Sequence, residues 1–296
     1  MNLHTFIHTT WGSVGKDGTR PPFFPGPQPI SIERKHMPML RRKPYLVCEK
    51  TDGTRISLVC YGPDIVLVDR KMAMTPVKLR VPPSASKGTI LDGEYVTARD
   101  GKDYYMVYDA VMVSGELVKH KSLHERIESA TSFVKKIMKT TKDTFRVKVK
   151  TFYTMDNIGT IVNKVRKDEF DYNNDGLVFT PDNEPVKIGT HKTMFKWKPR
   201  DHNTIDFLVK HRRDGTIGLY IQEHGELIFE SLITQDKKTI GMKENCIAEC
   251  QYQTESWPRW WKPLNIRTDK THPNNRITLS RTMVNIEENI KIDEFL

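Results

Sequence analysis

The sequence predicts an α+β protein with two domains, a mixed β-sheet with helices packed on its outside and then a small β-barrel. Three observations lead to this prediction. Runs rich in β-branched and aromatic residues begin at residue 45. Two stretches with helical periodicity interrupt these runs. Five further short strand-like runs follow a polar, turn-forming segment at residues 199–203.

We expect the first 43 residues to form an irregular, proline-rich arm that packs on the first domain (residues 1–43). Six prolines lie between residues 21 and 38, and each of them removes a backbone donor and fixes φ. One short helix near residues 30–37 is the regular element expected in this arm.

The first domain is expected to span residues 44–200. Its early strands are predicted at residues 45–50, 55–61, 65–70, 89–98 and 104–113. Asp52-Gly53 and Asp100-Gly101 are tight-turn sequences, so the strands on either side of each should pair as a hairpin. Ser122 and Glu125 form a capping box for a helix that runs to about residue 139. The later elements are a strand at 146–152, a helix at 155–167, and strands at 176–180 and 194–198.

The second domain is expected at residues 201–276, followed by a C-terminal helix at residues 277–296. Its predicted strands cover residues 204–211, 216–223, 226–232, 245–252 and 263–268. Five short strands of this kind are typical of a Greek-key barrel of the OB type.

The composition is typical of an intracellular protein that contacts polyanions. Lys and Arg number 47 against 37 Asp and Glu, a formal charge of +10, and such a field attracts nucleotides and nucleic acids. We find neither the run of ~18 apolar residues that a membrane helix needs nor a secretion signal. We therefore expect no membrane insertion and no secretion. The four cysteines lack a zinc-binding spacing and are expected to be reduced core thiols: Cys48, Cys60, Cys246 and Cys250.

Residues 47–55 are the stretch around which the other polar positions are arranged. Lys50 ends an apolar run and precedes Asp52-Gly53 and Arg55. A lysine beside such a turn is by itself most simply a solvated side chain. Further polar sites end or open later strands, and each alone has an ordinary explanation as a surface carboxylate, a turn former or a solvated strand face. Their common order predicts instead that they converge on a cleft at the edges of one sheet.

These residues resemble, in sequence order, the six motifs of the covalent nucleotidyltransferases. This superfamily contains the GTP:RNA guanylyltransferases, or mRNA capping enzymes, and the ATP- or NAD-dependent polynucleotide ligases. The matching segments are Lys50-Thr-Asp-Gly-Thr-Arg55, Asp92-Gly-Glu94, Tyr108-Asp109, Asp175-Gly-Leu177, Lys196-Trp-Lys198-Pro199 with Thr204-Ile-Asp206-Phe207, and Arg267-Thr-Asp269-Lys270.

The last two motifs resemble the capping branch of the superfamily. The segment after Asp69 and the tail at residues 285–290 are similar to the compact guanylyltransferase of large DNA viruses such as chloroviruses. The resemblance covers residues 44–296 and implies a nucleotidyltransferase domain of the ligase type, ATP-grasp-like in its mixed sheet, with a C-terminal OB-fold.

The resemblance implies that Lys50 is the catalytic nucleophile. Its neutral amine would attack the α-phosphorus of GTP, expel pyrophosphate and carry GMP as a phosphoramidate. The 5′-diphosphate end of an RNA would then take the GMP and form the GpppN cap. A free lysine amine is protonated at neutral pH, and nearby cations favour its neutral form. Arg55, Lys196 and Lys198 are the cations expected to do so.

The resemblance also implies how the nucleoside is recognised. Glu94 and Arg55 would hold the ribose hydroxyls, and Tyr108 would stack on the guanine. The backbone around Cys48 and Glu49, together with Lys196, would contact the edge of the base.

The phosphate end of the site follows from the same likeness. Arg70 and Lys198 would bind phosphate, and Asp175 would hold a divalent cation, Mg²⁺ or Mn²⁺, which suits carboxylate and phosphate oxygens. Arg267 and Lys270 would orient the pyrophosphate when the second domain closes. The implied nucleotide-binding set is completed by Asp206 and Asp269.

Two features depart from the family pattern or leave it open. Cellular capping enzymes often have an arginine two places before Arg267, whereas this chain has Asn265. Trp257, Trp260 and Trp261 either stack on RNA bases or fill the barrel.

The chain has no length left for triphosphatase or methyltransferase steps, so separate proteins are expected to supply them. The chain is expected to be a monomer.

Two other functions compete with guanylyl transfer. An ATP-dependent polynucleotide ligase would use Lys50 in the same way but would carry AMP. A non-catalytic RNA-binding module with a decayed site would form no adduct with either nucleotide.

Overall fold

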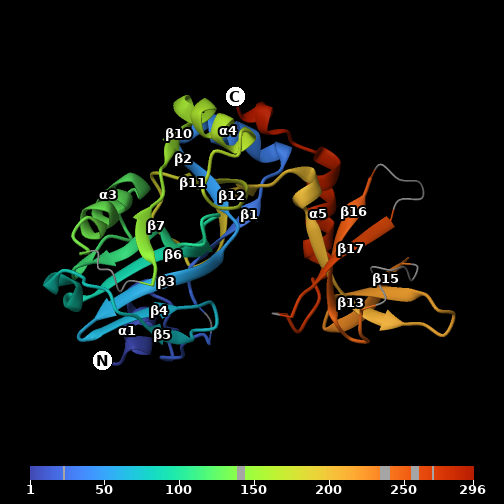
Figure 1. Cartoon of the computed structure of the whole chain (residues 1–296), viewed down its shortest axis with the longest axis horizontal. Coiled ribbons are helices and arrows are strands. Elements are labelled where there is room, and N and C mark those ends of the chain that lie inside the picture. Colours follow the sequence, from blue (N-terminus) through green and yellow to red (C-terminus); the bar gives the residue numbers. More distant parts are fainter. Residues whose placement is uncertain (23, 139–143, 234–240, 255–259, 269) are drawn as a thin grey trace. The chain divides into compact units, whose positions relative to one another are not determined.

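The computed structural model describes the chain except for residues 23, 139–143, 234–240, 255–259 and 269 (Figure 1). The described residues form two compact units. Unit 1 comprises Met1–Ile30, His36–Trp197 and Phe295–Leu296, and unit 2 comprises Ser31–Lys35 and Lys198–Glu294. None of the helices in the described part of the chain has the length and apolar character needed to cross a bilayer.

Unit 1 is built around two sheets. The first has the strand order β1 (Pro27–Ser31), β12 (Gly189–Trp197), β11 (Asn174–Pro181), β2 (Tyr45–Thr51) and β10 (Tyr153–Thr154). The second has the order β5 (Met74–Pro76), β4 (Asp64–Val68), β3 (Thr54–Tyr61), β6 (Thr89–Thr97), β7 (Asp103–Val113) and β8 (Glu116–Leu117), and β9 (Arg146–Val149) pairs in parallel with β7.

The predicted hairpin across Asp52-Gly53 is wrong, because β2 and β3 belong to different sheets. The Asp52 backbone N–H donates to the Asn173 carbonyl over 3.0 Å and stays with the first sheet. Gly53 lies against β6 so closely that a Cβ there would be 2.5 Å from the Tyr95 carbonyl oxygen. Only glycine fits this approach. The expectation of a single sheet is therefore corrected as well, since Lys50 lies where the chain passes from one sheet to the other.

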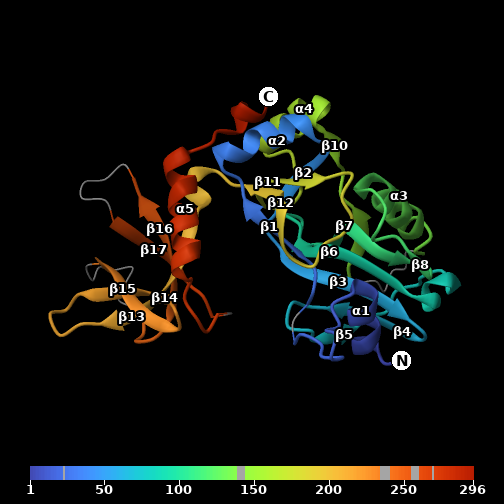
Figure 2. The ribbon, with the colours of Figure 1, turned by 180° about the vertical axis from the view of Figure 1, so that it is seen from behind.

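The second sheet is covered on both faces. Alternate residues of a strand point to opposite faces, and on β3 Leu58 belongs to one apolar cluster and Val59 to another. Helix α3 (Leu123–Val134) contributes Phe133 to the first cluster, and α1 (Leu3–Trp11) contributes Phe6 to the second. Figure 1 shows α3 alongside β7, and Figure 2 shows α1 beside β3, β4 and β5.

The helices confirm one sequence signal and correct another. The capping box of α3 is present, with the Ser122 N–H donating to Glu125 Oε2 over 2.9 Å. Helix α1 was not predicted, because the prolines of the first 43 residues favoured an irregular arm. Asn2 caps it by accepting from the Thr5 N–H over 2.8 Å. The other helices of unit 1 are α2 (Met37–Arg42) and α4 (Ile158–Arg166), with 3₁₀ turns at Arg34–His36, Pro83–Lys87, Met155–Asn157, Arg200–His202 and Ile292–Phe295 along the chain.

Unit 2 contains the five predicted strands. They are β13 (Thr204–His211), β14 (Ile217–Glu223), β15 (Glu226–Ile233), β16 (Ile247–Gln253) and β17 (Trp260–Ile266), in the sheet order β15-β14-β13-β16-β17. The outer strands β15 and β17 also contact each other, as expected for a five-stranded barrel of the OB type. Helix α5 (Arg276–Glu288) adds Leu279 to the barrel core.

The structure distinguishes between the two roles expected for the tryptophans near the start of β17, RNA stacking and barrel packing, for some of these residues. Trp261 is buried in the barrel core and meets Phe207 edge to face at 4.9 Å between ring centroids. It therefore fills the barrel rather than stacking on RNA. Trp260 packs against the same core, and Trp257 lies outside the described residues.

All four cysteines are free, which confirms the prediction of reduced thiols. Cys48, Cys60 and Cys250 are buried. Burial raises the pKa of Cys48 and of Cys60 to about 12, so both remain protonated at neutral pH.

The Arg126–Asp109 pair is a buried ion pair that anchors α3 on β7. Arg126 donates to Asp109 over 2.7 and 3.0 Å and also to the Lys121 and Glu184 carbonyls. Arg126 is 2% exposed and Asp109 is 6% exposed. Asp109 therefore serves the packing of the helix.

Replacing Arg126 with Met should destabilise unit 1 by about 3–5 kcal/mol, because Asp109 would stay buried without its partner. Urea denaturation followed by far-UV circular dichroism measures the loss. Lys102→Met, which breaks the exposed pair with Asp100, is the matched control and should leave the midpoint unchanged. Equal midpoints for the two variants would contradict this reading.

Candidate active site

Lys50 forms an ion pair with Asp175 at the end of β2. The Lys50 Nζ lies 2.7 Å from Asp175 Oδ1, and the two side chains are 22% and 14% exposed. The pair is thus partly shielded from water but still open to a ligand. It joins the first and fourth of the six motif segments.

An irregularity in β11 places the carboxylate there. The register between β11 and β2 runs from Asn174 opposite Thr51 to Leu177 opposite Glu49, so two residues of β11 face Lys50. Gly176 in this bulge has φ +149°, a conformation that favours glycine. The Asp175-Gly176 sequence therefore bends the strand so that its carboxylate reaches the lysine.

The two faces of the first sheet carry different parts of the site. Cys48 on β2 is opposite Val178 on β11, which is opposite Lys196 on β12. Cross-strand partners share a face, and Lys50 is two residues from Cys48. Lys50 and Lys196 therefore lie on the same face, as the family resemblance requires.

The opposite face carries a buried charge cluster centred on Lys150. Its Nζ donates to Thr51 Oγ1 over 2.8 Å and to the Glu49 carbonyl over 3.1 Å. It also lies 3.8 Å from the carboxylates of Glu49 and Glu94. The Thr51 hydroxyl donates to Glu94, and the Tyr172 hydroxyl donates to Glu49 Oε1 over 2.9 Å. One buried ammonium group thus compensates two carboxylates directly behind Lys50.

A second cluster is centred on Asp92, which is fully buried on β6. Arg55 donates to Asp92 through Nε over 3.2 Å and through Nη2 over 2.5 Å, and also to the Pro27 carbonyl. The Tyr108 hydroxyl donates to Asp92 Oδ1 over 3.2 Å. The charge of Arg55 is therefore matched by a carboxylate.

Sequence reasoning missed Lys150 and Tyr172. Neither belongs to a motif, and both reach the site from elements that are distant in sequence from Lys50. Lys150 follows β9, which is held beside β7 by parallel pairing, and this long-range pairing has no local signal. Asp92 was part of a motif, but its role as the partner of Arg55 was not predicted.

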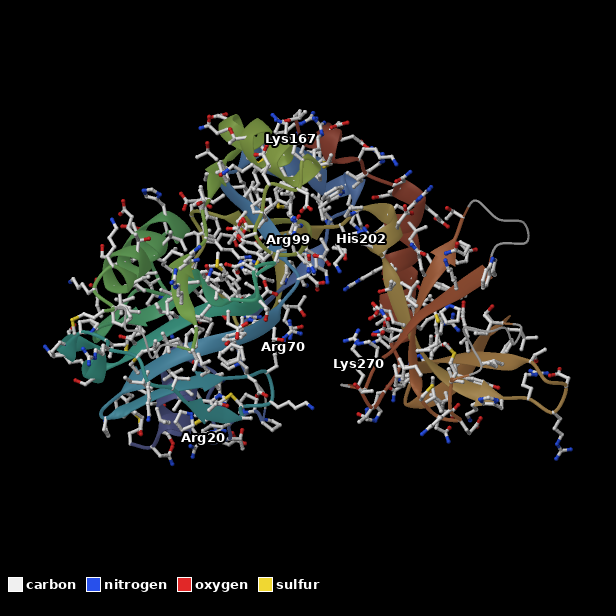
Figure 3. The ribbon with its side chains drawn as sticks, viewed as in Figure 1. Arg20, Arg70, Arg99, Lys167, His202 and Lys270 are labelled. Atoms are coloured by element: carbon white, nitrogen blue, oxygen red, sulfur yellow. The ribbon has the colours of Figure 1, made fainter. Side chains whose placement is uncertain are left out.

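Two predicted phosphate ligands follow the ends of strands, Arg70 after β4 and Lys198 directly after β12. Arg70 is exposed in the loop between β4 and β5 (Figure 3), a loop held by Asp69 Oδ1, which accepts from the Lys71 and Ala73 N–H groups over 2.8 Å. Lys198 is the first residue of the long segment of unit 2. Their binding of nucleotide stays a prediction.

The unit 2 motif residues meet at one buried carboxylate. Asp206 is 5% exposed on β13, and its carboxylate pairs with Arg267 at 3.5 Å and with Lys270. Asp269 lies outside the described residues. The structure therefore brings Asp206, Arg267 and Lys270 together, and their contact with nucleotide stays a prediction.

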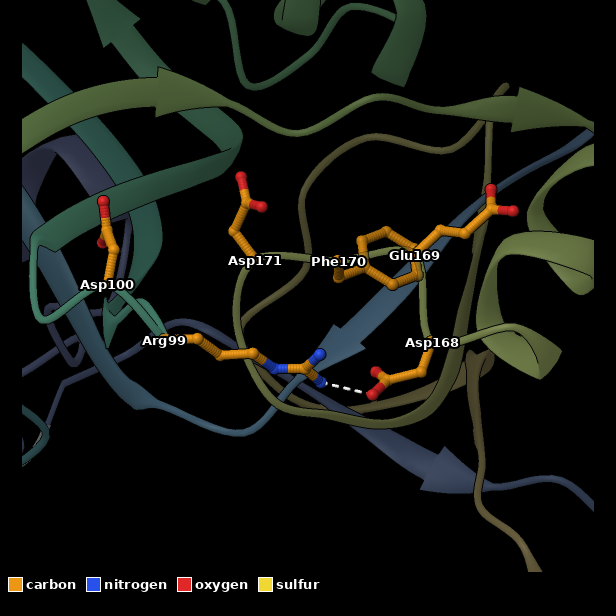
Figure 4. A pocket seen from close by; sticks show the side chains of 6 residues that line it. All are labelled: Arg99, Asp100, Asp168, Glu169, Phe170 and Asp171. Atoms are coloured by element: carbon orange, nitrogen blue, oxygen red, sulfur yellow. Dashed lines mark hydrogen bonds and ion pairs between the residues drawn. The ribbon is translucent and has the colours of Figure 1, made fainter.

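Unit 1 also has a pocket, separate from the Lys50–Asp175 pair, beside the segment that leads to Asp175 (Figure 4). It is lined by Arg99, Asp100, Asp168, Glu169, Phe170 and Asp171. Arg99 pairs with Asp168, and its backbone N–H donates to the Asp171 carbonyl over 2.7 Å. These contacts anchor the segment that continues to Tyr172 and Asp175. Among the described residues, no group of three or more His, Cys, Asp or Glu side chains is arranged to hold a metal ion.

The two-sheet unit with a lysine–carboxylate pair, followed in sequence by an OB-type barrel, has the fold class of the ligase-type nucleotidyltransferases. The fold agrees with a solved structure, mycobacterial DNA ligase D complexed with ATP and MES, at a TM-score of 0.50 and 13% identity. That match covers 83% of this chain and 95% of the ligase chain. It shows the fold alone.

Family models give the more specific assignment. The model for the mRNA capping enzyme, catalytic domain, matches residues 2–200, and the model for the C-terminal domain matches residues 202–296. The chain belongs to the mRNA capping enzyme family and is a nucleotidyltransferase that acts in mRNA capping. The resemblance to the capping branch is thereby confirmed, whereas the closer likeness to the viral form stays a prediction.

Two relatives show how much of the family this chain spans. The mRNA-capping enzyme subunit alpha of Schizosaccharomyces pombe is 29% identical, over 94% of this chain and 80% of that protein. The mRNA-capping enzyme of Mus musculus is 29% identical over 85% of this chain but only 45% of its own length. The chain thus spans less than half of the mouse protein.

Replacing Lys150 with Met should destabilise unit 1 by about 3–5 kcal/mol, because the buried Glu49 and the partly buried Glu94 would be left without this cation. Adding Glu94→Gln should restore part of that loss, since one uncompensated charge is removed. Urea denaturation measures both. Lys148→Met, two residues earlier and exposed, is the control. A double variant less stable than Lys150→Met would show that Lys150 does not act through Glu94.

Proposed function

We propose that this chain transfers GMP from GTP to the 5′-diphosphate end of RNA through a covalent bond to Lys50, forming the GpppN cap. The observation that carries the proposal is the 2.7 Å pair between Lys50 Nζ and Asp175 Oδ1. It joins two motif residues 125 positions apart in a partly shielded place. The family assignment supplies the reaction class.

In the first step the Lys50 amine attacks the α-phosphorus of GTP. The N–P bond forms, the bond from that phosphorus to the bridging oxygen breaks, and pyrophosphate leaves with the electron pair. The amine must lose a proton, and Asp175 Oδ1 is the acceptor within hydrogen-bond reach. Asp175 also fixes the direction of Nζ, because the bulge in β11 holds its carboxylate.

In the second step an oxygen of the RNA 5′-diphosphate attacks the same phosphorus. The new P–O bond forms as the N–P bond breaks, and the Lys50 amine regains a proton. The enzyme is then ready for another GTP. Because both steps use one phosphorus and one amine, the same residues that position Lys50 serve both.

The donor set around Lys50 fits a divalent cation that is shared with the substrate. Mg²⁺ is usually held by one or two carboxylates together with substrate phosphates, and Asp175 is a partly exposed carboxylate beside the attacking amine. We therefore propose Asp175 as the protein ligand of Mg²⁺ or Mn²⁺. When bound, the ion would neutralise charge that develops on the phosphate oxygens.

Nucleoside recognition is proposed for the residues behind and beside Lys50. Glu94 and Arg55 are cross-strand partners on β6 and β3, which supports a shared role at the ribose. Tyr108 is held by Asp92 and its ring lies 5.7 Å from Lys150 Nζ, which supports a fixed ring for guanine. Lys196 and the backbone of Cys48 and Glu49 remain the proposed contacts to the base edge.

Cap formation also implies other activities. A 5′-triphosphate RNA must first lose its γ-phosphate, and the finished cap is a substrate for methylation. We propose that a separate RNA triphosphatase and a separate cap methyltransferase supply these steps, that this chain acts as a monomer, and that it works inside the cell. The name "subunit alpha" of the S. pombe relative supports the use of separate proteins.

Incubation with α-labelled GTP and a divalent cation should place the label on the wild-type chain in a denaturing gel. Label from ATP in place of GTP would favour the ligase reading, and no label from either nucleotide would favour a binding module. Lys50→Arg keeps the charge but should abolish the adduct, because a guanidinium is not a nucleophile at neutral pH. Lys192→Arg, exposed on β12, should label normally. A labelled Lys50→Arg protein would contradict the proposal.

Asp175→Asn should slow adduct formation by about 100-fold or more, because it removes the positioned acceptor and the proposed ion ligand. In a Lys50→Ala background, which prevents turnover, the same change should weaken GTP-dependent Mn²⁺ binding measured by electron paramagnetic resonance. Asp171→Asn, exposed four residues earlier, is the control. Unchanged Mn²⁺ binding would contradict the assigned metal ligand, and an unchanged rate would contradict the role at the amine.

A further inference from the structure

The outward face of the barrel strands β13, β14 and β15 carries aromatic and basic side chains that the proposed chemistry does not use. Inward residues such as Val209 and Leu219 belong to the barrel core. Strand alternation and register therefore place the residues between them on the other face. We refer to the following set as the aromatic face: Lys210, Arg212, Tyr220, Leu227, Phe229 and Leu232.

Two aromatic rings lie at its centre. Tyr220 and Phe229 are direct cross-strand partners on β14 and β15. Their ring centroids are 5.7 Å apart and the ring planes are inclined by 74°. The two rings thus form one continuous aromatic surface across adjacent strands.

A cation lies over each ring. Lys210 Nζ is 5.1 Å from the centroid of Tyr220, and Arg212 Cζ is 5.8 Å from the centroid of Phe229. Arg212 also lies near the carboxylate of Asp214, at 3.7 Å. Cations at this distance are attracted to the ring face. The aromatic surface is therefore edged with positive charge.

Packing explains Tyr220 but not Phe229. A Cβ at Gly218 would lie 2.8 Å from a ring carbon of Tyr220, so this ring covers the glycine of the central strand. Phe229 is 44% exposed, and its neighbours Leu227 and Leu232 are 42% and 43% exposed. A phenylalanine so exposed beside two exposed leucines indicates a binding surface.

The same face carries the motif cations at its other end. Asp206 is two residues before Leu208 and four before Lys210, so the three side chains share a face of β13. Arg267 and Lys270 pair with Asp206 there. Positive groups thus lie at both ends of an aromatic centre, which matches a chain that carries a phosphate at every unit and a flat base between phosphates.

We propose that the aromatic face binds a single-stranded stretch of the RNA substrate downstream of its 5′ end. Phosphates would pair with Lys210 and Arg212 and draw them away from the ring faces, and bases would stack on Phe229 and Tyr220 in their place. The identity of the RNA as substrate rests on the function proposed above. Stacking with backbone neutralisation is tolerant of sequence, as capping of many different messages requires. The second and third strands of OB-folds are a common nucleic-acid surface.

A protein partner fits these observations less well. An apolar docking surface would leave both cations to be desolvated or paired. Among the described residues the nearby carboxylates are Asp214, 3.7 Å from Arg212, and Glu244, which accepts from the backbone N–H of His211. A polyanion satisfies the cations and covers the rings together. RNA is therefore the occupant to which the proposal commits.

The test compares wild type with Phe229→Ala and with Tyr220→Phe/Phe229→Leu, which keeps the ring over Gly218. The first assay is fluorescence anisotropy with a single-stranded RNA of about 16 nucleotides, the upper site size of one OB-fold. Affinity for this RNA should fall at least fivefold in both variants. Lys210→Gln should lower the slope of log affinity against log salt by about one. Leu264→Ala, 43% exposed on β17, is the control and should bind normally.

The second assay separates this proposal from the proposed function. Adduct formation from GTP without RNA should be unchanged in every variant, whereas transfer should show a higher KM for the long RNA and an unchanged KM for a dinucleotide acceptor. Failure of wild type to form any adduct would defeat the proposed function but not the anisotropy result. If the two Phe229 variants bind this RNA with normal affinity, the aromatic face is not an RNA site. The same conclusion holds if they bind RNA normally but lose self-association or binding to a protein partner.

Discussion

The passage of the chain from β2 to β3 is the constraint on which the rest of unit 1 depends. Within Asp52 and Gly53 the backbone leaves one sheet and enters another, and a side chain at Gly53 would collide with β6. Lys50 is thereby held at the end of the last strand before the crossing, where the first sheet supplies Asp175 as its partner. A simple hairpin would have kept β2 and β3 in one sheet.

The charged side chains around the site already form ion pairs with one another in the structure. Lys150 compensates Glu49 and Glu94, and Arg55 compensates Asp92. Buried carboxylates are costly unless they are paired and hydrogen-bonded, so these partners fix one another in place. Such fixed dipoles and charges need little reorganisation during a reaction. The side chains of the Lys50–Asp175 pair are also partly exposed, at 22% and 14%.

Local patterns predicted most elements and their order, because strand alternation, the Ser122 capping box and short barrel strands are properties of neighbouring residues. They could not predict that β2 and β3 would separate, since that depends on a close contact between Gly53 and a distant strand. Motif order identified Lys50 and Asp175, which the structure joins. It could not identify Lys150, whose place depends on parallel pairing of β9 with β7, nor the cation-edged rings of β14 and β15, which carry no motif.

One amine, that of Lys50, must become the carrier of GMP, and mass spectrometry tests this most directly. The chain is incubated with GTP and Mg²⁺, its intact mass is recorded, and peptides are then sequenced under conditions that preserve phosphoramidates. The account predicts the added mass of one GMP, located on the peptide that contains Lys50. No added mass, or a GMP on a different side chain, would contradict it.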